Sequence, residues 1–352
     1  MRILYIGKVV YGNTCYSRYR GYVRLRFHVD FINIEDFRIS NSLFIRLINN
    51  KNRFYLKSLN KKISNYAKKS YDIIHFDTPF YIFTETLNYI KNFTSSKIIF
   101  HYTDDIEVLK HGLLLNKSAY LLSDYIFTCN KFSIKYFNSI GIHHAFYNEV
   151  GYDDENIVVN KSDKFNKGNI HFGFVGHYEK SYENDLDLIS TSLHNVKKKN
   201  KDFENKLEVH GSGWYRNNFY KKKSYLSSIK KSLTGSVSHT KYWSFLSNVD
   251  VGVGLLSTMN RNKTTGRTFE IPASNSLLLT RETDTINTIF NHNETAVFWN
   301  DINIVDVLNE IIKDREKSKK ICKNGFEFIS DNKFKWIDRV GEIIEIIRSS
   351  NK

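Results

Sequence analysis

The chain has 352 residues, of which 41% are hydrophobic and 25% charged, and its 52 lysines and arginines against 37 acids give a formal net charge of +15. This composition excludes a disordered chain, and the length favours two domains of roughly 150 to 200 residues each. The cysteines Cys15, Cys129 and Cys322 show no CxxC or metal-ligand spacing. The absence of such spacing argues against a disulfide framework or a zinc site and indicates a reducing compartment.

Short apolar runs alternate with longer amphipathic stretches along the whole chain, a pattern typical of βαβ units. The predicted strands are residues 3–6, 29–32, 73–76, 98–101, 125–128, 170–175, 207–210, 249–255 and 276–280. Because strands that alternate with helices pair in parallel, we expect an α/β fold with one parallel sheet in each half.

The polar stretch at 148–168 interrupts this alternation and is the best domain boundary. We expect a first domain over residues 1–158, a second over 159–335, and a C-terminal helix over 336–352 that could pack back on the first. That helix has apolar residues at helical spacing, from Ile337 to Ile347.

The basic charge is concentrated at the start, where residues 1–70 hold 15 lysines and arginines against three acids. Such a field attracts anionic lipid, nucleic acid or a phosphorylated acceptor, although a solvated basic face would give the same composition. Residues 1–12 do not resemble a secretion signal, and no apolar run approaches the roughly 20 residues that span a bilayer. We therefore expect a cytoplasmic protein, at most peripheral on the inner face of the cell membrane.

The segment TTGRTFEIPASNSLLLT, residues 264–280, is the most informative. We expect a basic, glycine-containing loop, then a short helix that opens with Pro272, then a buried strand. Glycine allows a ligand close to the backbone, and a helix N-terminus favours anions, so the segment suits a nucleotide diphosphate. An ordinary surface loop fits the composition equally well.

Residues 170–345 resemble the C-terminal domain of the CgeB-type (spore maturation protein) glycosyltransferases, which are related to glycosyltransferase group 1. The similar stretches are GFVGHYEKSYENDLDLI (173–189), EVHGSGW (208–214), SVSHTKYWSFLSNVDVGVGL (236–255), TTGRTFEIPASNSLLLTRETDTINTIF (264–290) and KNGFEFI with the helix around Arg339. The N-terminal half is similar more loosely, through ILYIG, HYTDDI (101–106) and DYIFTCN (124–130).

The resemblance implies a GT-B fold, in which two Rossmann-like domains face each other across a cleft. It places an acceptor in the N-terminal domain and a nucleotide sugar in the C-terminal domain. It implies that Glu270 binds ribose hydroxyls, which suits a carboxylate that can accept two hydrogen bonds.

The other donor-binding residues that the resemblance implies are Arg267, facing the diphosphate, with Thr268, Gly176 and Lys180 near the phosphates. The wider group's retaining members often carry a further glutamate upstream of Glu270, but the residue eight positions before it is Asn262. Retention or inversion of the sugar's configuration therefore stays open.

Catalytic candidates follow two strands of the first domain, where a base could meet an acceptor hydroxyl. They are Asp77, His101, Asp104 and Asp105. Asp77 could instead shape a turn, and Asp104 or Asp105 could cap the helix that begins near Ile106. Two adjacent acids are a weak metal ligand set, and we expect no catalytic metal.

The loop at 7–14 lacks the GxGxxG spacing of a dinucleotide site, so we expect Gly12 to shape the wall of the cleft. The run YSRYRGYVRLRF (16–27) places Arg18 and Arg20 among tyrosines, which suits sugar stacking and phosphate contact. An amphipathic helix with a charged outer face is the alternative.

These features favour a metal-independent hexosyltransferase without a cofactor. Its substrates would be a UDP-linked nucleotide sugar and a glycan, lipid-linked or phosphate-bearing acceptor in cell-surface polysaccharide synthesis. The alternatives are a nucleotide-sugar epimerase or phosphorylase and a nucleic-acid-binding protein, for which the sequence shows no motif of the usual kinds.

Overall fold

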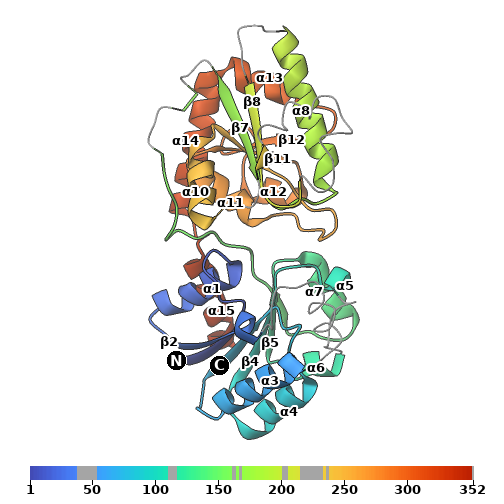
Figure 1. The fold of residues 1–352 in the computed structure, drawn as a ribbon, viewed down its shortest axis with the longest axis vertical. Helices are drawn as coiled ribbons and strands as arrows, with labels where there is room; N and C mark the ends of the chain where they lie inside the picture. Colours follow the sequence, from blue (N-terminus) through green and yellow to red (C-terminus); the bar gives the residue numbers. More distant parts are fainter. Residues whose placement is uncertain are drawn as a thin grey trace. The chain divides into compact units, whose positions relative to one another are not determined.

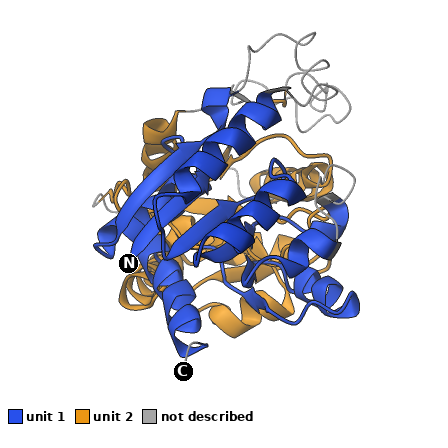
Figure 2. Ribbon diagram, turned by 90° about the horizontal axis from the view of Figure 1, so that it is seen from below, with its two compact units in different colours: residues 1–150, 335–352 blue, residues 151–334 orange. Residues whose placement is uncertain are grey.

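The computed structural model describes residues 1–37, 54–109, 117–160, 164–165, 169–199, 205–214, 233–234 and 238–350. The chain forms two compact units, which we call unit 1 (residues 1–150 and 335–352) and unit 2 (residues 151–334) (Figures 1 and 2). Within the described residues, no helix is long and apolar enough to cross a bilayer.

The chain passes from unit 1 to unit 2 after Val150, somewhat earlier than the expected boundary at residue 158. Asn148 still belongs to unit 1, because its Nδ2 donates to the Arg339 carbonyl at 3.1 Å. Tyr152 already belongs to unit 2, because its N–H donates to the Phe334 carbonyl at 3.0 Å. The C-terminal helix forms part of unit 1.

Unit 1 contains a six-stranded parallel sheet in the order β2-β1-β3-β4-β5-β6. Its strands are β1 (Arg2–Gly7), β2 (His28–Asn33), β3 (Ile73–Asp77), β4 (Lys97–Tyr102), β5 (Tyr125–Thr128) and β6 (Ala145–Tyr147). Its helices are α1 (Thr14–Arg24), the 3-10 helix η1 (Ile34–Phe37), α3 (Phe54–Ala67), α4 (Thr84–Phe93), α5 (Ile106–Leu109), α6 (Lys117–Leu121), α7 (Lys131–Ser139) and α15 (Trp336–Ser349).

Side chains of β1 alternate between the two faces of this sheet, as a strand requires. Ile3 and Tyr5 pack in the cluster that includes apolar residues of α1 and α15, whereas Leu4 and Ile6 pack in the cluster that includes α3 and α4. Helix α1 lies close against α15 because Gly21 has no side chain: a Cβ there would come within 2.8 Å of Val340 Cγ2.

Unit 2 contains a second six-stranded parallel sheet, in the order β12-β11-β10-β7-β8-β9. Its strands are β7 (Ile170–Val175), β8 (Asn205–His210), β9 (Leu233–Thr234), β10 (Val251–Gly254), β11 (Leu277–Arg281) and β12 (Val297–Trp299). Its helices are α8 (Tyr182–Lys199), α10 (His239–Asn248), α11 (Gly266–Ala273), α12 (Asp284–Ile289), α13 (Ile304–Lys313) and α14 (Arg315–Asp331).

Figure 1 shows α8 and α13 on one side of this sheet and α10, α11 and α14 on the other. Two strand glycines allow α10 and α11 to lie close. A Cβ on Gly173 would come within 2.6 Å of the Phe245 ring, and a Cβ on Gly252 would come within 2.5 Å of Ile271. The sheet is thus covered on both faces and leaves its strand ends for ligands.

Each sheet has one switch point. There the chain leaves two neighbouring strands toward opposite edges of the sheet. In unit 1 it lies at the carboxyl ends of β1 and β3, and in unit 2 at the carboxyl ends of β7 and β10. Ligands of doubly wound α/β sheets bind at such points. The two switch points are therefore where functional residues should lie.

All nine predicted strands are confirmed, with ends that differ by a few residues. Three short strands were not predicted: β6, β9 and β12. The expectation that a helix opens with Pro272 is wrong, because α11 begins at Gly266 and Pro272 lies in its last turn. Pro272 has no N–H to donate to the Thr268 carbonyl, so α11 lacks that hydrogen bond and ends one residue later, at Ala273.

Candidate functional site

Helix α11 places two of the predicted donor-binding residues at its first turns. It begins at Gly266, and its start is closed by the Thr268 hydroxyl, which accepts a hydrogen bond from Thr265 N–H at 3.0 Å. The Thr268 side chain is 1% exposed, so its hydroxyl serves as a cap inside the protein. The other two predicted donor-binding residues of this helix, Arg267 and Glu270, are partly exposed.

The Arg267 guanidinium lies at the unit 2 switch point. Its Nη1 donates to the carbonyl of Val175, the last residue of β7, at 3.3 Å, and its Nη2 donates to the carbonyl of Leu255, just after β10, at 3.5 Å. Nη2 also reaches the Tyr182 hydroxyl at 3.4 Å, and the group lies 5.1 Å from the centre of the Phe174 ring. These contacts hold a positive charge across the carboxyl ends of the two strands.

No carboxylate of the described residues forms an ion pair with Arg267, and its buried Nε–H has no hydrogen-bond partner there. Glu270, on the same helix, interacts with the Arg267 charge but forms no ion pair with it. Buried cations are normally paired because the loss of hydration is costly. Among the described residues, the partly exposed Arg267 guanidinium thus has no carboxylate within ion-pair distance.

Gly176, at the end of β7, leaves room for this guanidinium. A Cβ on Gly176 would come within 3.0 Å of Arg267 Nη1 and 2.8 Å of Phe174 Cζ. Two hydrogen bonds fix the Gly176 backbone. Its N–H donates to the His210 carbonyl at 2.9 Å, and Trp214 Nε1 donates to its carbonyl at 2.9 Å. The loop after β7 is thus fixed by the loop after β8.

The loop after β8 requires a glycine as well. Gly211 has φ +141°, and a Cβ there would lie 1.9 Å from the Gly176 carbonyl oxygen. Lys180 lies beyond this contact, exposed just before α8, and its backbone carbonyl accepts from Glu183 N–H at 3.2 Å. Glu179 joins the loop after β7 to the loop after β10 through a hydrogen bond from the Ser257 hydroxyl.

Glu270 lies one helical turn after Gly266, and the Tyr242 hydroxyl donates a hydrogen bond to its Oε2. Burial raises the pKa of the Glu270 carboxyl above its usual value, and nearby Asp153 adds to the rise. The Tyr242 hydrogen bond and the Arg267 charge act in the opposite direction and only partly offset it. Glu270 is thus a carboxylate with restricted hydration beside an unpaired cation.

The unit 1 switch point has a different composition. Asp77, the last residue of β3, accepts hydrogen bonds from Arg18 Nη1 and from the Tyr5 hydroxyl, and both Asp77 and Arg18 are at most 1% exposed. Burial acts to raise the pKa of Asp77, yet the Arg18 charge brings it below its usual value. The guanidinium also lies 4.7 Å from the Trp336 ring of α15. The structure therefore gives Asp77 and Arg18 a buried ion pair.

His101, at the end of β4, is 1% exposed and stacks on His75 at 5.7 Å between ring centres. Burial, with the positive charge of Arg18 and the neighbouring His75 ring, holds the pKa of His101 well below its usual value. Burial likewise lowers the pKa of His75 to about 3. Both rings are neutral at pH 7.

Asp104 and Asp105 have different surroundings. Asp105 is fully buried, and its Oδ1 accepts from Glu107 N–H at 3.0 Å, so it caps α5 as the alternative reading expected. Asp104 is partly exposed. Across the described residues, no three His, Cys, Asp or Glu side chains come close enough to hold a metal ion.

Gly12 lies just before α1, and Arg20 lies within it. Gly12 is exposed, with φ +81° in the turn that Asn13 N–H closes on the Val10 carbonyl at 3.0 Å. Arg20 is partly buried and lowers the pKa of Tyr19 against the larger effect of burial. Neither residue is as buried as Arg18, which is 1% exposed.

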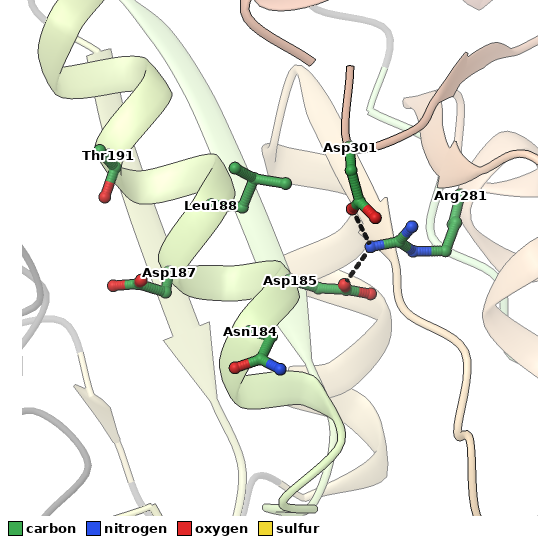
Figure 3. Close-up of a pocket in the computed structure, with 7 residues that line it drawn as sticks. All are labelled: Asn184, Asp185, Asp187, Leu188, Thr191, Arg281 and Asp301. Atoms are coloured by element: carbon green, nitrogen blue, oxygen red, sulfur yellow. Dashed lines mark hydrogen bonds and ion pairs between the residues drawn. The ribbon is translucent and has the colours of Figure 1, made fainter. Parts of the chain in front are cut away.

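A shallow cavity of about 360 Å³ lies elsewhere in unit 2 (Figure 3). It lies between α8 and the ends of β11 and β12, where Arg281 donates to Asp185 at 2.7 Å and to Asp301 at 2.8 Å. Figure 3 shows the guanidinium between the two carboxylates. Arg281, unlike Arg267, is fully paired with acids.

Comparisons with known proteins bear on the fold and on the family of the second half of the chain. Residues 190–345 match the family model described as glycosyl transferase-like. The structure is similar to HepE from Anabaena in complex with UDP and glucose, with a TM-score of 0.66, 14% identity, and 99% and 100% of the two chains covered. No curated protein sequence matches the chain.

Two further solved structures are similar over 99% of this chain. They are sucrose-phosphate synthase from Thermosynechococcus elongatus (TM-score 0.67, 10% identity, 98% of that chain) and the apo lipopolysaccharide outer core galactosyltransferase WaaB (TM-score 0.60, 15% identity, 100% of that chain). At these identities the likeness establishes the fold, which is GT-B. The family model and the fold together support a glycosyltransferase.

The sequence did not single out Tyr242, Gly211 or Trp214 as functional. All three lie inside stretches that carry the resemblance, KYW and HGSGW. Their roles depend on contacts between segments far apart in the sequence, such as the 28 residues that separate Tyr242 from Glu270.

Proposed function

We propose that the protein transfers a hexose from a UDP-linked nucleotide sugar to an acceptor. The acceptor would be a glycan, a lipid-linked molecule or a phosphate-bearing molecule. The observation that carries the proposal is the unpaired Arg267 guanidinium at the unit 2 switch point. A diphosphate would supply a negative charge to pair with the guanidinium and accept hydrogen bonds from it. HepE, whose structure is similar, has been solved with UDP and with UDP-glucose.

In this reaction the bond between the sugar's anomeric carbon and the diphosphate oxygen breaks, and a bond from that carbon to the acceptor oxygen forms. Arg267 would stabilise the charge that develops on the departing diphosphate, as fixed cationic groups do in phosphate chemistry. We propose that this guanidinium takes the place of a metal ion. Glu270 would orient the nucleotide through its ribose hydroxyls.

The acceptor hydroxyl must lose a proton to a base. Of the four candidates, Asp104 is the one with a partly exposed side chain, since Asp77, His101 and Asp105 are at most 1% exposed. We assign Asp104 as the base on that ground. Asp104→Asn should lower kcat by roughly 100-fold or more while UDP affinity stays the same. If Asp104→Asn turns over normally, the assignment is wrong.

The lysines of unit 1 favour binding to an anionic membrane. This supports an acceptor located at that membrane, as in cell-surface polysaccharide synthesis. Helix α3 carries Lys57, Lys61 and Lys62 and no acid. Each lysine near anionic lipid contributes about 1 kcal/mol, and salt screens the attraction. The protein should sediment with anionic vesicles at low salt and leave them at high salt. A protein that ignores these vesicles at every salt concentration would rule out the membrane location.

Thermal unfolding with UDP, GDP, CDP and dTDP tests the donor site, because a ligand of the folded state raises Tm. We expect UDP to give the largest rise. UDP-hexoses should then release UDP only when an acceptor is present. The proposal fails if none of the four nucleotides raises Tm, and acceptor-independent conversion of the sugar would indicate an epimerase or phosphorylase.

A further inference from the structure

The geometry points to Tyr242 as a positioning residue that holds the Glu270 carboxylate ready for the two hydroxyls of a ribose. This inference rests on the proposed function and adds a second helix, α10, to the nucleotide site. Tyr242 does not itself need to touch the nucleotide. It acts through Glu270.

The contact between the two side chains is direct. The Tyr242 hydroxyl donates to Glu270 Oε2, and it is the one donor to this carboxylate among the described residues. The next residue, Trp243, is 1% exposed, and its Nε1 donates to His239 Nε2 at 3.1 Å. The first turns of α10 are thereby fixed, and Tyr242 with them.

Gly266 leaves room for the carboxylate at the start of α11. A Cβ on Gly266 would come within 3.1 Å of Glu270 Oε1 and 3.2 Å of Oε2, so the carboxylate lies against the first turn of α11. A glutamate has three rotatable bonds and loses much freedom when it is fixed. Because Tyr242 occupies Oε2, Oε1 keeps its lone pairs for a ribose hydroxyl, and Oε2 keeps one more.

The ionisation of the pair fits this role. Burial, with the charge of Glu270, raises the pKa of Tyr242 well above its usual value, so the hydroxyl keeps its proton and remains a donor. Three groups facing Glu270 act on its ionisation: Tyr242 from α10, Arg267 from α11 and Asp153 from the segment that enters unit 2. Tyr242 and Arg267 favour the carboxylate, whereas burial and Asp153 oppose it.

Binding of UDP and of 2′,3′-dideoxy-UDP to the full chain tests the inference by calorimetry. The wild type should bind UDP at least about tenfold more tightly, since hydrogen bonds to a charged group are the stronger kind. In Tyr242→Phe this preference should shrink to about threefold or less, while affinity for dideoxy-UDP stays the same. Tyr71→Phe is the matched control, because Tyr71 also donates to a carboxylate, Asp30 Oδ2 at 2.6 Å, but lies in unit 1.

The pH dependence of UDP affinity gives a second readout that a purely structural tyrosine would not move. Affinity should fall as pH drops through the pKa of Glu270, which lies above its usual range. The midpoint should rise in Tyr242→Phe and fall in Asp153→Asn. If Tyr242→Phe does not fold, Gly266→Ala crowds the same carboxylate with a new Cβ and should also reduce the preference for UDP.

The outcomes separate the two proposals. A wild type that prefers UDP, with the preference intact in Tyr242→Phe, overturns the role of Tyr242 and leaves the proposed function standing. A wild type that binds neither ligand overturns both.

Discussion

The two switch points are built alike in the backbone and differ in their charges. In unit 1, Arg18 and Asp77 neutralise each other inside the protein, with the Tyr5 hydroxyl as a third member. In unit 2, Arg267 donates to two backbone carbonyls at the ends of β7 and β10, and no carboxylate in the described part of the chain forms an ion pair with it. The same position in a parallel sheet thus carries a charge paired within the chain in unit 1, and in unit 2 a charge that we propose a ligand pairs.

Breaking the unit 1 pair should have the largest effect on stability. Asp77→Ala leaves Arg18 buried without a partner and should lower the free energy of unfolding by about 3–5 kcal/mol, as measured by urea denaturation. Arg267→Ala removes a charge that is already unpaired and should leave that free energy nearly unchanged. Similar losses in both variants would erase the distinction between the two sites.

The double variant Arg18→Met with Asp77→Leu sharpens this prediction. It removes both charges at once, so it should be more stable than either single variant. Additive losses would mean that the pair contributes little beyond the packing of its two side chains.

Acid should destabilise the protein through the two neutral histidines beside this pair. His75, with a pKa of about 3, and His101 stay unprotonated in the folded state, whereas unfolded histidines bind a proton near pH 6.5. The contribution of these histidines to the free energy of unfolding is therefore fully present above about pH 6.5. It is lost as pH falls, by about 1.4 kcal/mol per pH unit for each histidine.

His75→Gln removes one of these groups. Its free energy of unfolding, followed between pH 6 and pH 4, should fall less steeply than that of the wild type. Parallel curves would mean that His75 is already protonated in the folded protein.

Gly211→Ala should disturb the unit 2 switch point by a smaller amount. The new Cβ would lie 1.9 Å from the Gly176 carbonyl at a φ of +141°, so the loop after β7 must shift, at a cost of about 1–3 kcal/mol. UDP affinity should fall together with Tm. Gly341→Ala is the matched control, because nothing lies within 4 Å of its Cβ in α15, and it should raise stability by about 0.5–1 kcal/mol. A Gly211→Ala protein with unchanged Tm would show that the two loops do not hold each other.

The sequence predicted the fold well because each sheet is made of buried apolar runs. The strands it missed, such as Val297–Trp299 and Ala145–Tyr147, have three residues each, too few to show a pattern. The early start of α11 was missed because Gly266 and Arg267 have the composition of a loop, and only the contact between Thr265 and Thr268 identifies the cap.

The site was only partly predictable. Arg267, Glu270 and Gly176 came from a resemblance, and the structure brings Arg267 and Gly176 into contact at the unit 2 switch point. Arg18 and Asp77 were predicted as binding and catalytic residues, because nothing in the sequence shows that two residues 59 positions apart form an ion pair. Tyr242 was missed for the same reason, since its partner lies on another helix.

Calorimetry of UDP and uridine binding to Arg267→Ala tests the central claim most directly. Charge-assisted hydrogen bonds contribute about 1.5–3 kcal/mol each, so UDP affinity should fall by roughly 10- to 100-fold while uridine affinity stays the same. Arg281→Ala, which removes a guanidinium paired with Asp185 and Asp301, should leave both affinities unchanged. Equal losses for UDP and uridine in Arg267→Ala, or an equal loss of UDP affinity in Arg281→Ala, would contradict the assignment of the unpaired guanidinium to a diphosphate.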